Sequence, residues 1–210
     1  MQSIRDKHLV LVVALSLWAI TVSYGVASLW AYDTKPGVAA SAPRVYSKEK
    51  GPVAMGDRML MLVFLHPHCP CSNATLEQLE ILLRSRKIEL ECRVYVVVPP
   101  EAVAGWEKGP LLERVHSIPG VLVKYDFGGI ETQRFAASTS GQVLLYERNR
   151  SLVFSGGITA SRGHPGESLG ARAILALLEN RSTPITVAPV YGCPLLNLGS
   201  LCGGVSPCKL

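Results

Sequence analysis

The chain has 210 residues, 48% of them hydrophobic, which is enough for one folded domain with a substantial core and additional segments. Lysine and arginine exceed aspartate and glutamate by a formal net charge of +5, but the basic residues are scattered along the chain. Because nucleic-acid-binding proteins gather basic residues into a patch or stripe, we expect no nucleic-acid partner.

The first predicted element is a membrane anchor at residues 9–30, which contain no charged residue. A helix of this length spans the hydrocarbon core of a bilayer. A cleaved signal peptide is the alternative, but its apolar region is usually only about 7 to 15 residues long. Residues 1–8 would then form a short cytoplasmic tail.

The orientation of this anchor does not follow from its flanking basic residues, which lie on both sides of it. The cysteine content favours an oxidising compartment, because three of the six cysteines fall within the last 18 residues. We therefore expect a single-pass protein of the cell membrane whose C-terminal domain is extracytoplasmic, on the periplasmic side.

A linker is predicted at residues 31–56, which are rich in Pro, Gly, Ala and Ser and show no hydrophobic period. The folded domain, residues 57–185, begins with a short apolar run typical of a buried parallel strand, at residues 59–65. From Ser72 to Lys87, leucines recur at helical spacing. The sequence thus places a strand, a loop and a helix in succession.

Further elements follow in chain order. The alternating stretch at residues 88–99 predicts a strand, with Cys92 on its apolar face as an inert buried thiol. The remaining predicted elements are a helix at residues 111–117, a strand at 120–127, a hairpin at 141–158 with its turn at 147–150, and an amphipathic helix around 169–178.

The loop between the first strand and the first helix reads His-Pro-His-Cys-Pro-Cys, residues 66–71. A thiolate on Cys69 would meet the unpaired N–H groups and the positive dipole end of the helix, and cationic His66 or His68 would stabilise it further. We therefore predict that Cys69 is a nucleophile with a lowered pKa and that Cys71 is the resolving thiol. The one-residue spacing closes a small ring, which favours an oxidising or isomerising role.

This order of elements, with cysteines at a helix start, resembles the thioredoxin-like superfamily over about residues 57–180. The chain also resembles the small membrane-anchored RedB-type proteins of bacteria in three stretches, at residues 66–71, 139–146 and 156–164. The resemblance implies a three-layer α/β fold, with a central mixed sheet between helices, that follows the N-terminal transmembrane helix.

One departure from the superfamily concerns the cis-proline that faces the cysteines in thioredoxins. At that place this sequence has Ser138-Thr139-Ser140-Gly141. In the superfamily the proline shapes the substrate groove and is thought to keep metals off the thiols. Its absence weakens a plain thioredoxin activity and strengthens a metal-binding alternative.

Two loops converge on Cys69 in this fold, at residues 137–141 and 159–167. The second loop carries Arg162, a fixed donor or cationic neighbour for the thiolate, and His164, an acid, a base or a metal ligand. The alternative is that this loop is a polar surface turn without a role in the site.

Two functions are consistent with these residues. The first is a membrane-anchored extracytoplasmic thiol–disulfide oxidoreductase that acts on protein thiols or disulfides and requires no cofactor, with His68 tuning the thiolate. The second is a copper or zinc handling protein on the same fold. Its Cu(I) or Zn ligands would come from a soft sulfur and imidazole set: Cys69, Cys71, His66, His68 and His164. A third interpretation leaves the two motif cysteines as a plain structural disulfide.

The C-terminal tail, residues 186–210, contains Cys193, Cys202 and Cys208. We expect two of these to pair, most simply Cys202 with Cys208, which leaves Cys193 as a free thiol held against the domain. Pairing of Cys193 with Cys202 is a second possibility. A functional alternative is that the odd cysteine exchanges electrons with the cysteine motif or joins a metal site.

Overall fold

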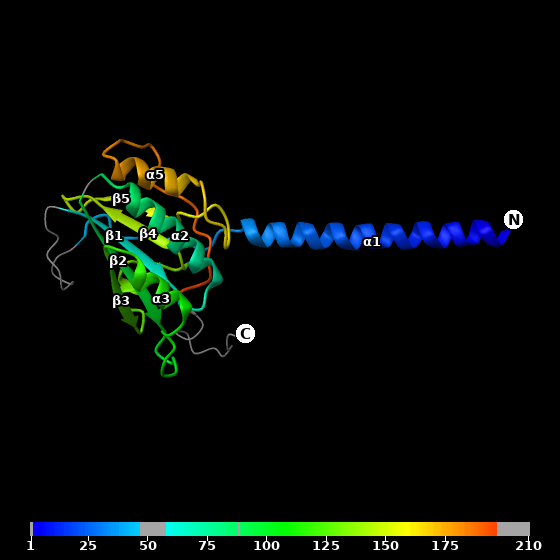
Figure 1. The fold of residues 1–210 in the computed structure, drawn as a ribbon, viewed down its shortest axis with the longest axis horizontal. Helices are drawn as coiled ribbons and strands as arrows, with labels where there is room; N and C mark the ends of the chain where they lie inside the picture. The colour runs from blue at the N-terminus through cyan, green and yellow to red at the C-terminus, as the bar shows by residue number, and fades with distance from the viewer. Residues whose placement is uncertain (1, 47–57, 88, 197–210) are drawn as a thin grey trace. The chain divides into compact units, whose positions relative to one another are not determined.

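The computed structural model describes residues 2–46, 58–87 and 89–196 (Figure 1). The chain forms two compact units that divide between Lys35 and Pro36. The predicted pairings of Cys202 and Cys208 lie outside the described residues.

The first unit is a single helix, α1 (Gln2–Thr34). Within Arg5–Thr34, the most apolar 18-residue stretch has a mean hydropathy of 2.2, and none of it is buried. By length and composition α1 could span a membrane, and a signal sequence near an N-terminus has the same character.

The second unit is built on a five-stranded sheet with the strand order β3-β2-β1-β4-β5. The strands are β1 (Met59–Leu65), β2 (Leu90–Val98), β3 (Val121–Phe127), β4 (Gln142–Tyr146) and β5 (Leu152–Gly156). The first three strands run parallel, whereas β4 is antiparallel to both of its neighbours. This mixed sheet has the topology of the thioredoxin-like fold, as the sequence predicts.

Helices and irregular segments cover both faces of the sheet (Figure 1). The helices are α2 (Pro70–Ser85), α3 (Pro110–Ser117), α4 (Ile130–Arg134) and α5 (Leu169–Leu178). Because successive strand residues point to opposite faces, Met61 and Val63 join a core with α2, α3 and α5, while Leu62 and Phe64 join a second core. Both cores are buried, so β1 lies at the centre of the domain.

Most of the predicted elements are present. The helix expected from Ser72 begins two residues earlier, at Pro70, because the fixed backbone angle of proline suits the first turn and its missing N–H is not needed there. Helix α4 could not be predicted from the sequence, since five residues are too few to show a helical period.

The second face of the sheet is covered by residues 36–46, which fall within the predicted linker. The Gly37 N–H donates to the Val190 carbonyl over 2.8 Å. Tyr46 is 2% exposed and stacks on the ring of Phe135, with ring centroids 6.0 Å apart. These residues are therefore part of the folded domain, although the sequence has no hydrophobic period there that predicts it.

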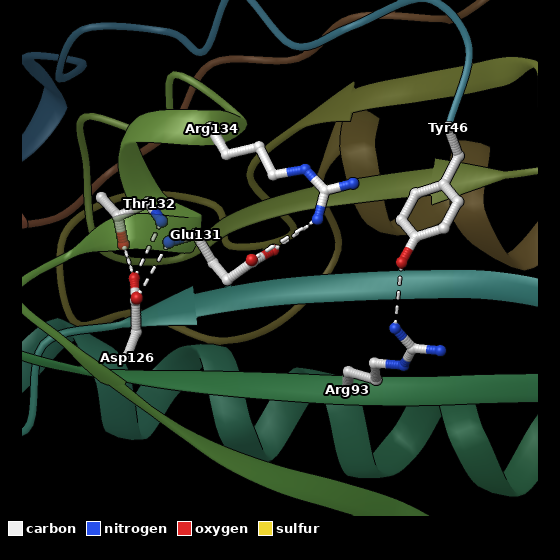
Figure 2. A network of polar contacts seen from close by, with 6 residues as sticks. All are labelled: Tyr46, Arg93, Asp126, Glu131, Thr132 and Arg134. Carbon is white, nitrogen blue, oxygen red and sulfur yellow. Dashed lines mark hydrogen bonds and ion pairs between the residues drawn. The ribbon is translucent and has the colours of Figure 1, made fainter. Parts of the chain in front are cut away.

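The alternating pattern of β2 predicts that its polar side chains face solvent. In the structure, Glu91 and Arg93 are instead buried on the second face of the sheet. Figure 2 shows Arg93, whose Nη1 donates to the hydroxyl of Tyr46 over 3.1 Å. The Nε of Arg93 also pairs with Glu91 over 2.6 Å. Buried charges need such partners, and this set fixes residues 36–46 to β2.

The short helix α4 depends on the carboxylate of Asp126 at the end of β3 (Figure 2). That carboxylate accepts hydrogen bonds from the N–H groups of Glu131 and Thr132, at 2.9 and 2.8 Å. Arg134 pairs with Glu131 one turn later, over 3.2 Å. The Asp126 carboxylate thus provides acceptors for N–H groups that have no partner within the helix.

We expect the Tyr46→Phe variant to lower the free energy of unfolding by about 1–3 kcal/mol, because the buried guanidinium of Arg93 loses an acceptor. Thermal unfolding of the full-length protein in detergent measures the change. Tyr125→Phe is the control, since Tyr125 is 38% exposed and its loss should be small. Equal stability of the two variants would contradict the role of the Tyr46 hydroxyl.

Candidate functional site

Cys69 lies where β1 passes into α2, at the N-cap of the helix. Its backbone is extended, with φ −88° and ψ 118°, and Pro70 follows at the first helical position. The Cys69 N–H donates to the His66 carbonyl over 3.1 Å, and the Ser72 N–H donates to the Cys69 carbonyl over 3.0 Å. The turn thus holds the Cys69 sulfur beside the helix N-terminus.

A third cysteine meets the motif. The Sγ of Cys193 is 2.8 Å from the Sγ of Cys69, and the Cys193 N–H donates to the Cys69 sulfur over 3.4 Å. Cys69 is only 1% exposed and Cys71 8% exposed, while Cys193 is half-buried. All three are free thiols in this structure, as is the buried Cys92.

Cys193 reaches this position because its chain segment pairs with the loop that precedes β4. We call residues 191–195 the Cys193 segment. The Ser140 N–H donates to the Cys193 carbonyl over 2.8 Å, and the Leu195 N–H donates to the Ser138 carbonyl over 3.0 Å. Thr139 and Pro194 form an antiparallel bridge between these bonds. The segment therefore crosses the site like a short added strand.

The loop at residues 137–141 also contacts the cysteine motif directly. The Ser140 Oγ accepts a hydrogen bond from the His66 N–H over 2.9 Å and lies 2.8 Å from the Ser72 Oγ. The Ser72 hydroxyl in turn donates to the His66 carbonyl over 3.0 Å. Serine hydroxyls thus connect this loop, the motif and α2.

The three thiols have different acidities. Hydrogen bonds from the thiols of Cys193 and Cys71 lower the pKa of Cys69, and they outweigh the opposing effect of burial. The hydrogen bond to Cys69 raises the pKa of Cys193. For Cys71, the contact with Cys193 lowers the pKa, but the hydrogen bond to Cys69, burial and the charge of Cys69 together raise it. Cys69 is therefore the thiol of the three that loses its proton most readily.

His66 supports this thiolate less than the sequence predicts. Burial lowers the pKa of His66, so its imidazole is neutral near pH 7. The His66 Nδ1 accepts a hydrogen bond from the His68 N–H over 3.2 Å. The prediction that a cationic His66 stabilises the Cys69 thiolate is therefore wrong. The thiols of Cys193 and Cys71 stabilise it by hydrogen bonds instead.

His68 packs against Trp106, a residue that belongs to no motif in the sequence. The His68 Nε2 donates to the Trp106 carbonyl over 2.9 Å, and the two rings lie 4.4 Å apart between centroids. His66 also packs on Trp106, at 5.7 Å. An aromatic wall thus borders the motif, formed by the loop between β2 and α3, where the sequence shows no periodic pattern.

The second predicted loop contributes Arg162. Its Nη1 donates to the Gly192 carbonyl over 2.6 Å, and its positive charge acts on Cys71, whose pKa it lowers in part. His164 instead uses Nδ1 within its own turn, at 2.7 Å from the Arg162 carbonyl and 3.0 Å from the Ser161 hydroxyl. Arg162 therefore connects this loop to the Cys193 segment, whereas these two contacts of His164 lie within its own loop.

The predicted metal ligands are Cys69, Cys71, His66, His68 and His164. Among residues 2–46, 58–87 and 89–196, no group of three or more His, Cys, Asp or Glu side chains is arranged to hold a metal ion. Copper or zinc binding therefore stays a hypothesis, to be tested on the protein itself.

The distribution of charge predicts a pH dependence for the thiols. Because the pKa of Cys69 is lowered, its thiolate should persist as the pH falls below about 8.5, the ordinary value for cysteine. Cys71 and Cys193 should stay protonated at that pH. The ultraviolet absorbance of thiolate, recorded against pH, measures this. A Cys69→Ser protein should lose the low-pH thiolate, and its persistence there would refute the assignment.

Comparison with known proteins shows similarity at the level of structure. No protein-family model matches the sequence, and no curated protein matches it. A crystal structure of an uncharacterized conserved protein from Geobacillus kaustophilus aligns over 77% of this chain and 96% of its own, with a TM-score of 0.56 and 18% identity. A hypothetical protein from Sinorhizobium meliloti 1021 aligns over 66% and 79%, with a TM-score of 0.51 and 21% identity.

A third similar structure is a secreted Mycobacterium tuberculosis disulfide oxidoreductase homologous to E. coli DsbE. It aligns over 58% of this chain and 81% of its own, with a TM-score of 0.41 and 13% identity. At identities this low, likeness to solved structures concerns the fold alone, so the function has to be argued from the site.

Proposed function

We propose that this protein is a membrane-anchored, extracytoplasmic thiol–disulfide oxidoreductase that acts through Cys69-Pro70-Cys71. The observation that carries the proposal is the thiolate character of Cys69, at the N-cap of α2 with two thiol donors. A thiolate is the nucleophile in disulfide exchange, and a helix N-terminus is a setting that activates one.

The reaction needs only the two motif cysteines. The Cys69 thiolate attacks one sulfur of a protein disulfide, so that a mixed disulfide forms and the other substrate sulfur leaves as a thiolate. Cys71 then loses its proton and attacks the Cys69 sulfur, which releases the second substrate thiol. The product is a Cys69–Cys71 disulfide, and two electrons have passed to the substrate. The reverse sequence oxidises a substrate dithiol.

The surrounding residues would support this exchange without a cofactor. His68 with Trp106 forms one border of the motif, and Arg162 holds the backbone at Gly192. His164 lies in the same loop as Arg162, where it would shape the turn. With α1 as a single-pass anchor, the partners are protein thiols or disulfides on the periplasmic side.

Metal handling is the alternative, and one preparation separates the two functions. Full-length protein would be purified in detergent without a metal-affinity column, its copper and zinc content measured, and its exchange with a disulfide-linked fluorescent peptide followed. We expect exchange that persists in the presence of a chelator. Stoichiometric copper or zinc in a protein without exchange activity would overturn the oxidoreductase proposal.

A further inference from the structure

The Cys193 segment makes the contacts that an extended peptide substrate would make. Peptides that bind by strand addition take their affinity from main-chain hydrogen bonds to an exposed backbone. Here the carbonyl of Cys193 and the N–H of Leu195 pair with Ser140 and Ser138, which places a cysteine thiol on the Cys69 sulfur.

The close approach of this segment is specific to its sequence. A Cβ atom on Gly192 would lie 2.0 Å from the Ser140 carbonyl oxygen, so only glycine fits there. Arg162 binds the Gly192 carbonyl, and the side chain of Leu195 is 1% exposed in the second core. The segment is thus fixed on both sides of Cys193.

We propose that Cys193 is a third redox-active thiol and that its segment is a built-in substrate of Cys69. This inference rests on the proposed function, since it needs Cys69 to undergo disulfide exchange. It deepens that function by naming the thiol with which Cys69 pairs when no external substrate occupies the site.

The step is an internal exchange that needs no outside oxidant. Starting from a Cys69–Cys71 disulfide, the thiolate of Cys193 attacks the Cys69 sulfur. The Cys69–Cys193 bond forms, the Cys69–Cys71 bond breaks, and Cys71 takes up the proton that Cys193 lost. The number of disulfides and of electrons is unchanged.

The direction of this exchange follows from ring size. A disulfide across one intervening residue closes a small ring, and strained disulfides are the more easily broken. The Cys69–Cys193 bond joins segments 124 residues apart whose sulfurs already lie at 2.8 Å. The hydrogen bond that raises the pKa of Cys193 also disappears once Cys69 is in a disulfide. The Cys69–Cys193 disulfide therefore predominates over the Cys69–Cys71 disulfide in the oxidised protein.

The first test is disulfide mapping of full-length protein in detergent. A Cys202→Ser/Cys208→Ser background leaves Cys193 as the tail's one cysteine. After oxidation with oxidised glutathione, acid quenching and alkylation, mass spectrometry of peptides should find most Cys69 linked to Cys193. Adding Cys193→Ser should convert the linkage to Cys69–Cys71. Oxidised protein that contains only Cys69–Cys71 while Cys193 stays free would overturn the proposal.

The second test measures whether the segment covers Cys69. In reduced protein, Gly192→Ala should displace the segment and raise the alkylation rate of Cys69 about tenfold or more. Val187→Ala is the matched control, because Val187 lies four residues before the segment and is 65% exposed. An unchanged rate in Gly192→Ala, with Cys193→Ser also unchanged, would refute the covering role.

The two proposals fail in different ways. If Cys69→Ser still exchanges with the fluorescent disulfide peptide, the oxidoreductase site itself is wrong. If Cys69→Ser is inactive but Cys193→Ser exchanges at the unaltered rate and forms no new linkage, only the role of Cys193 is wrong. A Cys193→Ser protein that reacts faster with the external peptide supports the built-in substrate.

Discussion

Replacing Cys69 with serine is expected to lower the rate of exchange with a disulfide peptide by about three orders of magnitude or more, to the rate without protein. Cys69 is the thiol of the site whose pKa is lowered, and it would form the covalent bond to the substrate. Stopped-flow fluorescence of the full-length protein with the disulfide-linked peptide measures the rate. A Cys71→Ser/Cys193→Ser protein should instead keep the first attack and accumulate the mixed disulfide, because both thiols that can attack the Cys69 sulfur are gone.

The matched control for this prediction is Cys92→Ala. Cys92 is 1% exposed in the first core, and burial raises its pKa to about 12, so its thiol should take no part in exchange. We expect the exchange rate of Cys92→Ala to equal that of the wild type. A loss of exchange in Cys92→Ala as large as that in Cys69→Ser would show that the assay reports folding instead of chemistry.

Gly170→Ala is expected to lower the free energy of unfolding by about 2 kcal/mol or more. Alanine favours a helix over glycine by about 1 kcal/mol. Its methyl group, however, would meet the Gly157 carbonyl oxygen, which lies 1.8 Å from the ideal Cβ position. Backbone cannot yield as a flexible side chain does, so the overpacking cost of about 1–3 kcal/mol or more prevails.

Urea unfolding of the full-length protein in detergent measures this effect, with Arg172→Ala as the control two residues along α5. The Arg172 side chain is 57% exposed, and its replacement should change stability by less than about 0.5 kcal/mol. If Gly170→Ala were more stable than the wild type, α5 would have to sit further from the end of β5.

The strands and most helices could be predicted because their cores impose a period on the sequence. In β1, every residue is buried, and the sequence shows this as an uninterrupted apolar run. In α2, leucines recur on the face that packs against the sheet. The cysteine motif could be placed as well, since it stands between these two elements.

The features that could not be predicted from the sequence depend on contacts between distant segments or on burial. Residues 36–46 are held by backbone hydrogen bonds and by Tyr46, and contacts of this kind leave no periodic pattern. The burial of Glu91 and Arg93 could not be predicted, because Tyr46, which accepts a hydrogen bond from Arg93, comes from a segment far away in the sequence. The neutral state of His66 depends on burial, which only the folded chain defines.

The contact between Cys193 and Cys69 could not be predicted for the same reason, because it joins distant segments. The sequence leaves open whether this residue is a structural thiol or an exchange partner, because it lies in an irregular tail beyond the elements of the fold. Its contact with Cys69 arises from pairing with residues 138–140, a register that only the folded chain specifies.

The pairing of the Cys193 segment also bears on which molecules can compete for Cys69. A thiol held within the same chain has a high effective concentration, in the millimolar range for short flexible linkers and higher when it is preorganised. A dilute small thiol would rarely displace it. An unfolded polypeptide could, because its backbone can replace the hydrogen bonds to Ser138 and Ser140 while its cysteine replaces Cys193. Selectivity for extended protein chains over small thiols would then follow from competition with the protein's own tail.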